Sequence, residues 1–318
     1  MKDKAMLWVF LAFALGFALP VCSCVGTGAV TLGALGQIGQ QPLPGSMGTG
    51  DAVAVIQLDG AITSAPTDYF TTTGITPERV RSLLDQADAN PAVKAVVVRV
   101  NSPGGSVVAS DEIYNTFRNY EKPIVVAMGD TAASGGFYIA CGADYMMAHP
   151  DTLTGSIGVI SQFFNAEELL DKVGVEPVVI TSGEFKDIGS LYRDMTEEER
   201  ELWRTILDQI YEDFVAVVAE ARDLAAEEVR EVADGRVFTG QQALEMGLVD
   251  EVGTRQAAID KAAELGEIEG DPRVIELRAQ PTFLEMFYSF TNRSPLPTVE
   301  EIVGWSGTPS LRYSVPQR

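Results

Sequence analysis

Residues 92–105 read "AVKAVVVRVNSPGG", a run of β-branched residues that ends in a turn rich in Ser, Pro and Gly. A short apolar run bounded by turn residues predicts a buried strand. Residues 52–60, "AVAVIQLDG", and residues 123–130, "PIVVAMGD", have the same character. Between these runs lie residues 76–91 and 110–123, whose apolar side chains recur at helical spacing. The alternation predicts an α/β fold with a mostly parallel sheet and flanking helices.

Further elements are expected along the chain. Residues 144–150, "DYMMAHP", and residues 176–181, "EPVVIT", predict two more short strands. A long helix is predicted over residues 196–222, where Thr196 and Glu199 stand at the spacing of a capping box. One face of this helix is apolar and predicts a contact with the core or with another subunit; it consists of Leu202, Ile206, Ile210, Phe214 and Val217.

The composition is strongly acidic and limits the possible partners. The chain has 318 residues, only 23 of them Lys or Arg, and a net charge of -22. A nucleic-acid-binding surface needs clustered basic residues, so we expect no nucleic-acid partner. Adaptation to high salt is one explanation of such an excess of carboxylates. Cys22, Cys24 and Cys141 are too few and too scattered for a disulfide framework.

The N-terminal segment is apolar and uncharged. Residues 5–25 give 21 residues without charge, and the next charged residue is Asp51. About 20 such residues are enough for a helix that crosses a membrane. Lys2 and Lys4 precede the segment, so the positive-inside rule predicts a single-pass protein of the cell membrane. Its N-terminus would be cytoplasmic and the rest of the chain would lie on the outer face.

Two other interpretations of the N-terminus remain open. A cleaved signal peptide also has an apolar segment, and "VCSC", which ends at Cys24, loosely resembles a lipoprotein processing site. We expect three parts in the chain: residues 1–50 form an anchor and a flexible linker, and residues 51–270 form the folded domain. Residues 271–318 lose clear periodicity but keep aromatic residues, which predicts a tail that docks on another surface.

Three glycine-rich turns stand at the ends of predicted strands, at residues 101–107, 132–138 and 154–159. Catalytic groups of parallel α/β sheets gather at the carboxyl ends of strands, so these turns are expected to meet. Gly104 and Gly105 allow a backbone that exposes consecutive N–H groups, which suits an oxyanion hole. Taken singly, the first two turns are more simply explained as tight corners that need small residues.

Ser134, in "DTAASGGFYIACG", is a candidate nucleophile at a strand-to-helix turn. A nucleophilic serine needs a base, and the chain has a single histidine, His149, which stands beside a proline with no paired acid. We therefore expect His149 to be structural. A neutral lysine is the other possible base. Of the seven lysines, Lys186 in "TSGEFKDIGS" lies in an irregular, glycine-flanked segment, although a simple surface lysine is the alternative interpretation.

Taken together, the motifs resemble those of the signal peptide peptidase A (SppA) family, in its single-domain membrane-anchored form, within the Clp protease and crotonase superfamily. The similarity covers about residues 53–265. It includes five motifs in order: "NSPGGSV", "AASGGFYIACGAD", "TLTGSIGVI", "SGEFKDIGS" and "GRVFTGQQALEMGLVDEVG".

The resemblance implies a serine endopeptidase with a Ser-Lys dyad. Ser134 matches the nucleophile, Lys186 the general base, and Ser156 the serine that orients the lysine. The backbone N–H groups of Gly105 and Gly135 would form the oxyanion hole. The family needs no ATP, cofactor or metal, and the chain has no Walker-type loop. The implied substrates are remnant signal peptides and other extended apolar peptides. The implied assembly is a homo-oligomer whose active sites are shared between protomers.

Two alternatives stay open. A related membrane-bound Clp-like protease acts with stomatin-type partners, but its usual extra membrane helices after the protease domain are missing from this sequence. The second alternative is a catalytically silent scaffold on the crotonase fold. The presence of Ser134, Lys186 and Ser156 together argues against it.

Overall fold

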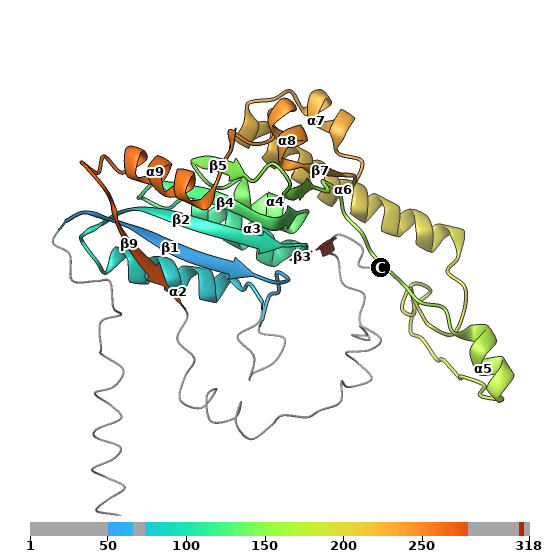
Figure 1. The fold of residues 1–318 in the computed structure, drawn as a ribbon. Coiled ribbons are helices and arrows are strands. Elements are labelled where there is room, and N and C mark those ends of the chain that lie inside the picture. The colour runs from blue at the N-terminus through green and yellow to red at the C-terminus, as the bar shows by residue number, and fades with distance from the viewer. Residues whose placement is uncertain (1–49, 66–73, 279–311, 315–318) are drawn as a thin grey trace, which may run out of the picture. The chain divides into compact units, whose positions relative to one another are not determined.

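The computed structural model describes residues 50–65 and 74–278, and the backbone of residues 312–314 (Figure 1). Strands β1 (Ala52–Asp59), β2 (Val93–Ser102) and β4 (Ile124–Ala133) lie side by side and parallel at the centre of a sheet. The expected α/β fold with a mostly parallel sheet is therefore confirmed. The predicted membrane-spanning helix falls outside the described residues, and no helix within them is long and apolar enough to cross a membrane.

The sheet has the strand order β7-β6-β4-β2-β1-β9, and β5 pairs with both β4 and β8. Only the β6–β7 pair is antiparallel in this sheet. Residues 125–127 of β4 pair with β5, whereas residues 131–133 pair with β6. The second half of β4 and the end of β6 therefore reach the same edge. The remaining strands are β5 (Tyr145–Ala148), β6 (Leu153–Gly155), β7 (Val237–Thr239), β8 (Glu251–Val252) and β9 (Arg273–Leu277).

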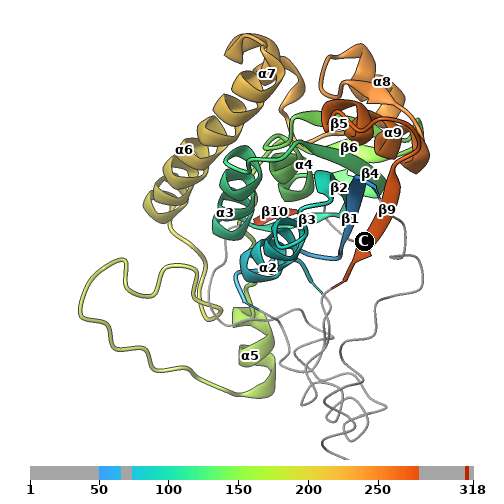
Figure 2. The ribbon, with the colours of Figure 1, turned by 90° about the vertical axis from the view of Figure 1, so that its left-hand side faces the viewer.

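Helices cover both faces of the sheet (Figure 2). The first of them begins as the sequence predicts, because Thr76 is its N-cap, the Arg79 amide donates to Thr76 Oγ1 at 3.3 Å, and Pro77 occupies its first turn. The helices are α2 (Pro77–Asp88), α3 (Val107–Arg118), α4 (Gly135–Ala140), α5 (Glu167–Val173), α6 (Glu197–Arg222), α7 (Ala226–Val232), α8 (Gly240–Glu245) and α9 (Arg255–Leu265).

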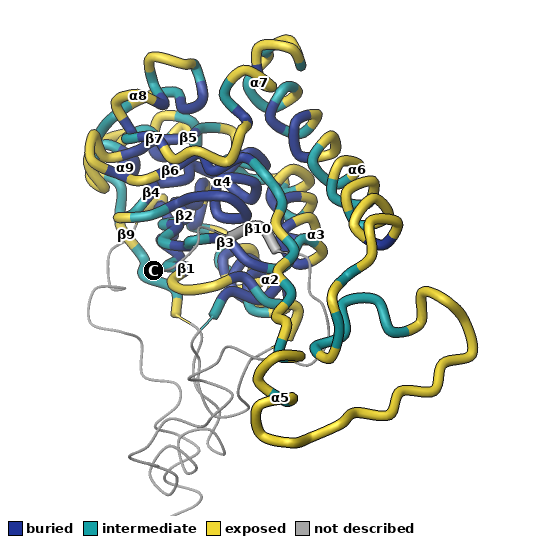
Figure 3. Tube along the Cα trace, turned by 90° about the vertical axis from the view of Figure 1, so that its right-hand side faces the viewer, coloured by how far each residue is buried: buried dark blue, intermediate teal, exposed yellow. Residues whose placement is uncertain are grey.

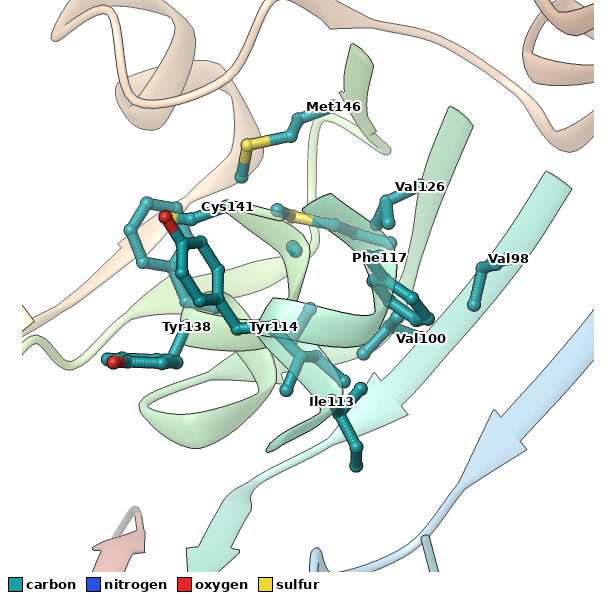
Figure 4. Close-up of a cluster of buried hydrophobic side chains, with 14 of the residues drawn as sticks. Val98, Val100, Ile113, Tyr114, Phe117, Val126, Tyr138, Cys141 and Met146 are labelled. Carbon is teal, nitrogen blue, oxygen red and sulfur yellow. The ribbon is translucent and has the colours of Figure 1, made fainter. Parts of the chain in front are cut away.

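The central strands are buried on both faces, which explains their unbroken apolar runs. Ile56 and Leu58 of β1 belong to the larger core with α2, α3, α4 and α6, whereas Val53 and Val55 pack on the opposite face with α9. Part of the larger core is drawn in Figure 4. Within this core, the Tyr138 ring of α4 contacts the Phe214 ring of α6 edge to face, with centroids 5.0 Å apart. These contacts fix α4 between the sheet and α6.

The long helix α6 divides into two halves. Its capping box is present as predicted, with Thr196 and Glu199 in reciprocal hydrogen bonds. Phe214 and Val218, in the C-terminal half, are buried in the core, whereas Leu202 in the N-terminal half is 43% exposed. The predicted apolar face is thus a core contact at one end and uncovered at the other.

Residues 158–198, which we call the arm, contain no buried residue (Figure 3). The arm includes α5 and the segment 176–181, for which the sequence predicted a strand. That prediction is wrong, because this segment forms no strand and its apolar side chains are open to solvent. Val178 is 84% and Ile180 is 92% exposed. β-branched residues favour a strand only where a neighbouring edge and a covering face exist, and this segment has neither in the described chain.

A short strand from the C-terminal tail completes the fold. Strand β10 (Arg312–Ser314) pairs antiparallel with β3 (Gly104–Ser106), and Tyr313 stands opposite Gly105. This pairing involves three residues of the segment for which a docking tail was predicted. Residues 279–311 fall outside the described part of the chain. The tail strand therefore lies on the first of the three glycine-rich turns.

Candidate active site

Ser134 stands at the turn between β4 and α4, with φ 54 and ψ -118. A positive φ is strained for a residue other than glycine and costs about 1–3 kcal/mol. The turn is held because the Ser134 amide donates to the Gly155 carbonyl at 2.7 Å, and the Ser134 carbonyl accepts from the Tyr138 amide at 2.8 Å. The Ser134 hydroxyl oxygen is buried and has no hydrogen-bond partner among the described residues. A buried hydroxyl without a partner is costly and points to a chemical role.

The glycine-rich turns of residues 101–107 and 132–138 lie against each other. A methyl group on Gly135 would come within 3.2 Å of the Gly105 amide nitrogen and 2.6 Å of Ser110 Oγ. A methyl group on Gly105 would come within 2.0 Å of the Ile62 carbonyl oxygen. Only glycine fits these two positions. The Gly105 amide nitrogen therefore lies close to Gly135, the residue that follows Ser134.

The third turn brings Ser156 to the same edge. Ser156 follows Gly155, whose carbonyl accepts the Ser134 amide, and its own amide donates to the Arg236 carbonyl at 2.8 Å. Ser156 is 5% exposed and also has a positive φ, 51. It lines an open cleft of about 600 Å³ between α6 and the root of the arm. The cleft is lined further by Ile160, Phe163, Trp203, Leu207, Tyr211 and Asp234, among others.

Lys186 is placed differently. It lies in the arm, its side chain is exposed, and its Nζ makes no hydrogen bond or ion pair with any described residue. Successive turns shape the backbone around it, with the Lys186 amide donating to Gly183 and the Ile188 amide to Phe185, at 3.1 and 3.3 Å. The structure thus brings Ser134, Ser156, Gly105 and Gly135 together within one chain but joins Lys186 to none of them.

His149 stands apart from these residues. It follows β5, its side chain is 56% exposed, and its Nδ1 accepts a hydrogen bond from the Asp151 amide at 3.3 Å. It has no hydrogen bond to Ser134 in the described chain. Its contacts are those of a turn at a strand end.

An ion-pair network next to Lys186 was not predicted from the sequence. The guanidinium of Arg193 donates to both oxygens of Asp187 at 2.8 and 2.9 Å, and to both oxygens of Glu199 at 2.5 and 2.9 Å. These bonds to Arg193 lower the pKa of Glu199 to about 2 and also lower the pKa of Asp187. The sequence shows one arginine among several acids in "KDIGSLYRDMTEEE". Only the fold shows which of these acids the arginine pairs with.

Two family models match parts of the sequence. Residues 116–269 match the model of peptidase family S49, and residues 72–154 match the Clp protease model. Among solved structures, a ClpP1 variant from Listeria monocytogenes aligns with a TM-score of 0.41 and 16% identity, covering 64% of this chain and 94% of that one.

Sequence relatives extend the match. A protein of Synechocystis sp. described as a protease is 49% identical over 185 residues, which cover 58% of this chain and 66% of that protein. A protein of Enterococcus faecium that carries the name of signal peptide peptidase SppA is 36% identical, covering 72% of this chain and 71% of that protein. Protease 4 of Haemophilus influenzae is 32% identical, and the match spans 81% of this chain but 42% of that enzyme. The chain belongs to peptidase family S49, as an SppA-type serine peptidase of the Clp protease and crotonase superfamily.

Proposed function

We propose that the protein is an ATP-independent endopeptidase in which Ser134 is the nucleophile and Lys186 the general base. The proposed peptidase domain consists of residues 51–270 and of strand β9, which pairs with β1 in the same sheet. The observation that carries the proposal is the Ser134 hydroxyl, which is buried, without a hydrogen-bond partner in the described chain, and held in a strained turn. Strain and unmet hydrogen bonds of this kind concentrate at catalytic sites.

The chemistry follows from these groups. The neutral Lys186 amine takes the proton of Ser134 as its oxygen attacks a peptide carbonyl. The oxyanion that forms is stabilised by the N–H groups of Gly105 and Gly135. Lys186 then gives the proton to the leaving amine, and water hydrolyses the acyl-enzyme. The Ser156 hydroxyl accepts a hydrogen bond from the lysine and orients it. No step needs a metal or an organic cofactor.

Lys186 reaches the site from another copy of the chain in this proposal. The Lys186 amine has no hydrogen-bond partner among the described residues, and the Ser134 hydroxyl has none either, so each half of the proposed dyad lacks its complement. The arm also exposes large apolar side chains, which mark interaction surfaces when they cluster. They are Phe164, Leu169, Val173, Val178, Ile180 and Phe185, from 45% to 92% exposed. A homo-oligomer would cover them and complete the site.

The substrate is an extended, apolar peptide, which includes the remnants of signal peptides. Support comes from β10, which pairs antiparallel with Gly104–Ser106 beside the oxyanion amides. Strand addition on such an edge derives affinity from main-chain hydrogen bonds, and pockets beside it give selectivity. The apolar stretch of residues 5–25 is the proposed membrane anchor, with the peptidase domain on the outer face.

The test is to assay hydrolysis of an apolar peptide ester by the full chain. Ser134→Ala and Lys186→Ala should each reduce kcat/KM by at least about 10³-fold, because residues that act as a unit fail together. Thermal unfolding should be unchanged in both variants. An acylating serine-reactive probe should label Ser134 in the parent chain.

The shared site is tested by mixing the two inactive variants. A mixed oligomer contains sites with an intact Ser134 from one chain and an intact Lys186 from the other, so activity should return on subunit exchange. Normal turnover by Lys186→Ala would refute the dyad. Exchange without recovered activity would refute the shared site alone.

A further inference from the structure

Lys186 is exposed, so an interaction outside the core must fix its position if it is to act as a base. A general base must lie within about 2.6–3.2 Å of the proton that it takes. The long lysine side chain extends from an arm in which no residue is buried, so burial in the core does not hold its backbone. Some other interaction has to fix the turn that carries it.

Arg193 supplies that interaction. All five N–H groups of its guanidinium are engaged: paired bonds go to each of Asp187 and Glu199, and Nη1 also donates to the Asp194 carbonyl at 3.0 Å. Paired arginine–carboxylate bonds are directional and restrict rotation as well as distance. Asp187 is the residue directly after Lys186, so one end of this network lies beside the lysine.

The other end of the network lies on a rigid element. The Glu199 side chain is only 3% exposed. Its carboxylate also accepts the Thr196 amide at 2.8 Å, in the capping box that begins α6. The C-terminal half of α6 is anchored in the core through Phe214 and Val218, both fully buried. A continuous chain of contacts therefore runs from the core to the residue next to Lys186.

A second contact supports the same turn. Gly189 has φ 75, and a methyl group there would lie 2.6 Å from two atoms of the Phe163 ring. The Phe163 ring contacts the Trp203 ring of α6, with centroids 5.1 Å apart. The turn around Lys186 is thus held against α6 at two points, one ionic and one aromatic.

We propose that Arg193 is a positioning residue for Lys186, tying the turn that carries the lysine to the first turn of α6 through Asp187 and Glu199. This inference rests on the proposed function of Lys186 as the general base.

The experiment compares Arg193→Gln with a matched control in the full chain. Arg230 pairs with Glu212 through two hydrogen bonds, at 2.6 and 3.3 Å, and links α7 to α6 away from the arm. Arg193→Gln should lower kcat about 100-fold, the cost of a misplacement of about 1 Å, with KM nearly unchanged. Arg230→Gln should leave both constants as they are. Arg193→Lys keeps the charge but loses the paired geometry, so its kcat should lie between those of the parent chain and Arg193→Gln.

A second measurement separates positioning from simple loss of folding. Hydrogen exchange should accelerate at the amides of residues 183–190 in Arg193→Gln, while the chain stays folded and the oligomeric state stays unchanged. A parent-like kcat in Arg193→Gln, or a full loss of the fold in Arg193→Lys, would refute the positioning role. If Lys186→Ala is inactive and Arg193→Gln is fully active, the dyad stands and this inference fails. If Lys186→Ala is active, the proposed function itself fails.

Discussion

The two halves of the proposed site are built by different means. The Ser134 half lies where β4, β6 and α4 meet, and close packing of small residues fixes every atom around it. The Lys186 half lies in the arm, where no residue is buried and hydrogen bonds and ion pairs hold the backbone. In the proposed mechanism, packing holds the nucleophile and the oxyanion hole within each chain. The arm would carry the base on a surface that meets a second copy, which would tie activity to assembly.

The sharpest test of this contrast is to make the arm polar. The double substitution Val178→Glu and Ile180→Glu replaces the two most exposed apolar side chains of the arm with charges. The oligomer should dissociate, and hydrolysis should fall by at least about 10³-fold, as when either dyad residue is removed. Sedimentation and the peptide ester assay measure the two effects. Met246→Glu, an exposed apolar position on another surface, is the control.

The fold of each monomer should be retained in the arm variant, because neither side chain packs in the monomer. An intact oligomer with full activity would show that these residues are not the contact. The proposal that the Lys186 half of the site depends on a second copy of the chain would then lose its support.

The packed half should respond to a single methyl group. Gly135→Ala places a methyl 2.6 Å from Ser110 Oγ and 3.2 Å from the Gly105 amide. We expect a loss of about 10²–10³ in kcat from displacement of the oxyanion donors, and about 1–3 kcal/mol of stability from overpacking. Gly183→Ala is the matched change in the arm, and it should be silent because nothing lies within 4 Å of the added methyl.

Removing the clash provides a check. The double variant Gly135→Ala and Ser110→Ala removes the nearest colliding atom, so part of the lost melting temperature should return. If Gly183→Ala were as damaging as Gly135→Ala, the two halves would not differ in packing.

The ion pairs of the arm should be sensitive to acid. Glu199 has its pKa lowered to about 2 by Arg193, so its ionised form stabilises the fold above its unfolded pKa of about 4.3. This stabilisation is lost progressively as the pH falls from about 4.3 towards 2. Melting temperatures measured across this range should drop less steeply in Glu199→Gln than in the parent chain. If the melting temperatures of the two proteins fell equally with pH, the Arg193–Glu199 pair would not contribute to stability.

The smallest effect is expected at Cys141, deep in the packed half. Burial raises the pKa of its thiol to about 12, and the side chain is 6% exposed. A thiol in this state is a poor nucleophile. At pH 8 the native protein should resist alkylation at Cys141, as measured by peptide mass mapping, and should keep full activity. Modification at a rate typical of an unfolded chain would show that the core near Ser134 opens.

The sequence predicted the packed half better than the arm. Apolar runs around residues 52–60 and 92–105 specify buried parallel strands, and the end of each strand specifies where the turns meet. The pattern therefore placed Ser134 and the glycines at strand ends, whereas their proposed roles came from the family resemblance. Residues 176–181 have the composition of a strand but no edge to pair with in the described chain, so the same pattern predicted the wrong structure.

The role of Arg193 shows a second limit of the sequence. Its partners Asp187 and Glu199 are each six residues away, a spacing that matches neither a helix nor a strand. Only the path of the arm brings the three side chains together. Periodicity identifies contacts within regular elements, and this network lies between a loop and a helix end.

The pairing of β10 with Gly104–Ser106 has a consequence for selectivity. A strand edge made of two glycines and a serine can bind a peptide mainly through backbone hydrogen bonds. Only an extended peptide has free backbone N–H and C=O groups to pair with this edge. A helical peptide, whose amides are already bonded to one another, must unwind before it can bind. The free energy needed to unwind the helix would weaken the binding of that peptide. The enzyme would therefore select peptides first by their conformation and then by their sequence. Folded proteins would be spared by their own stability.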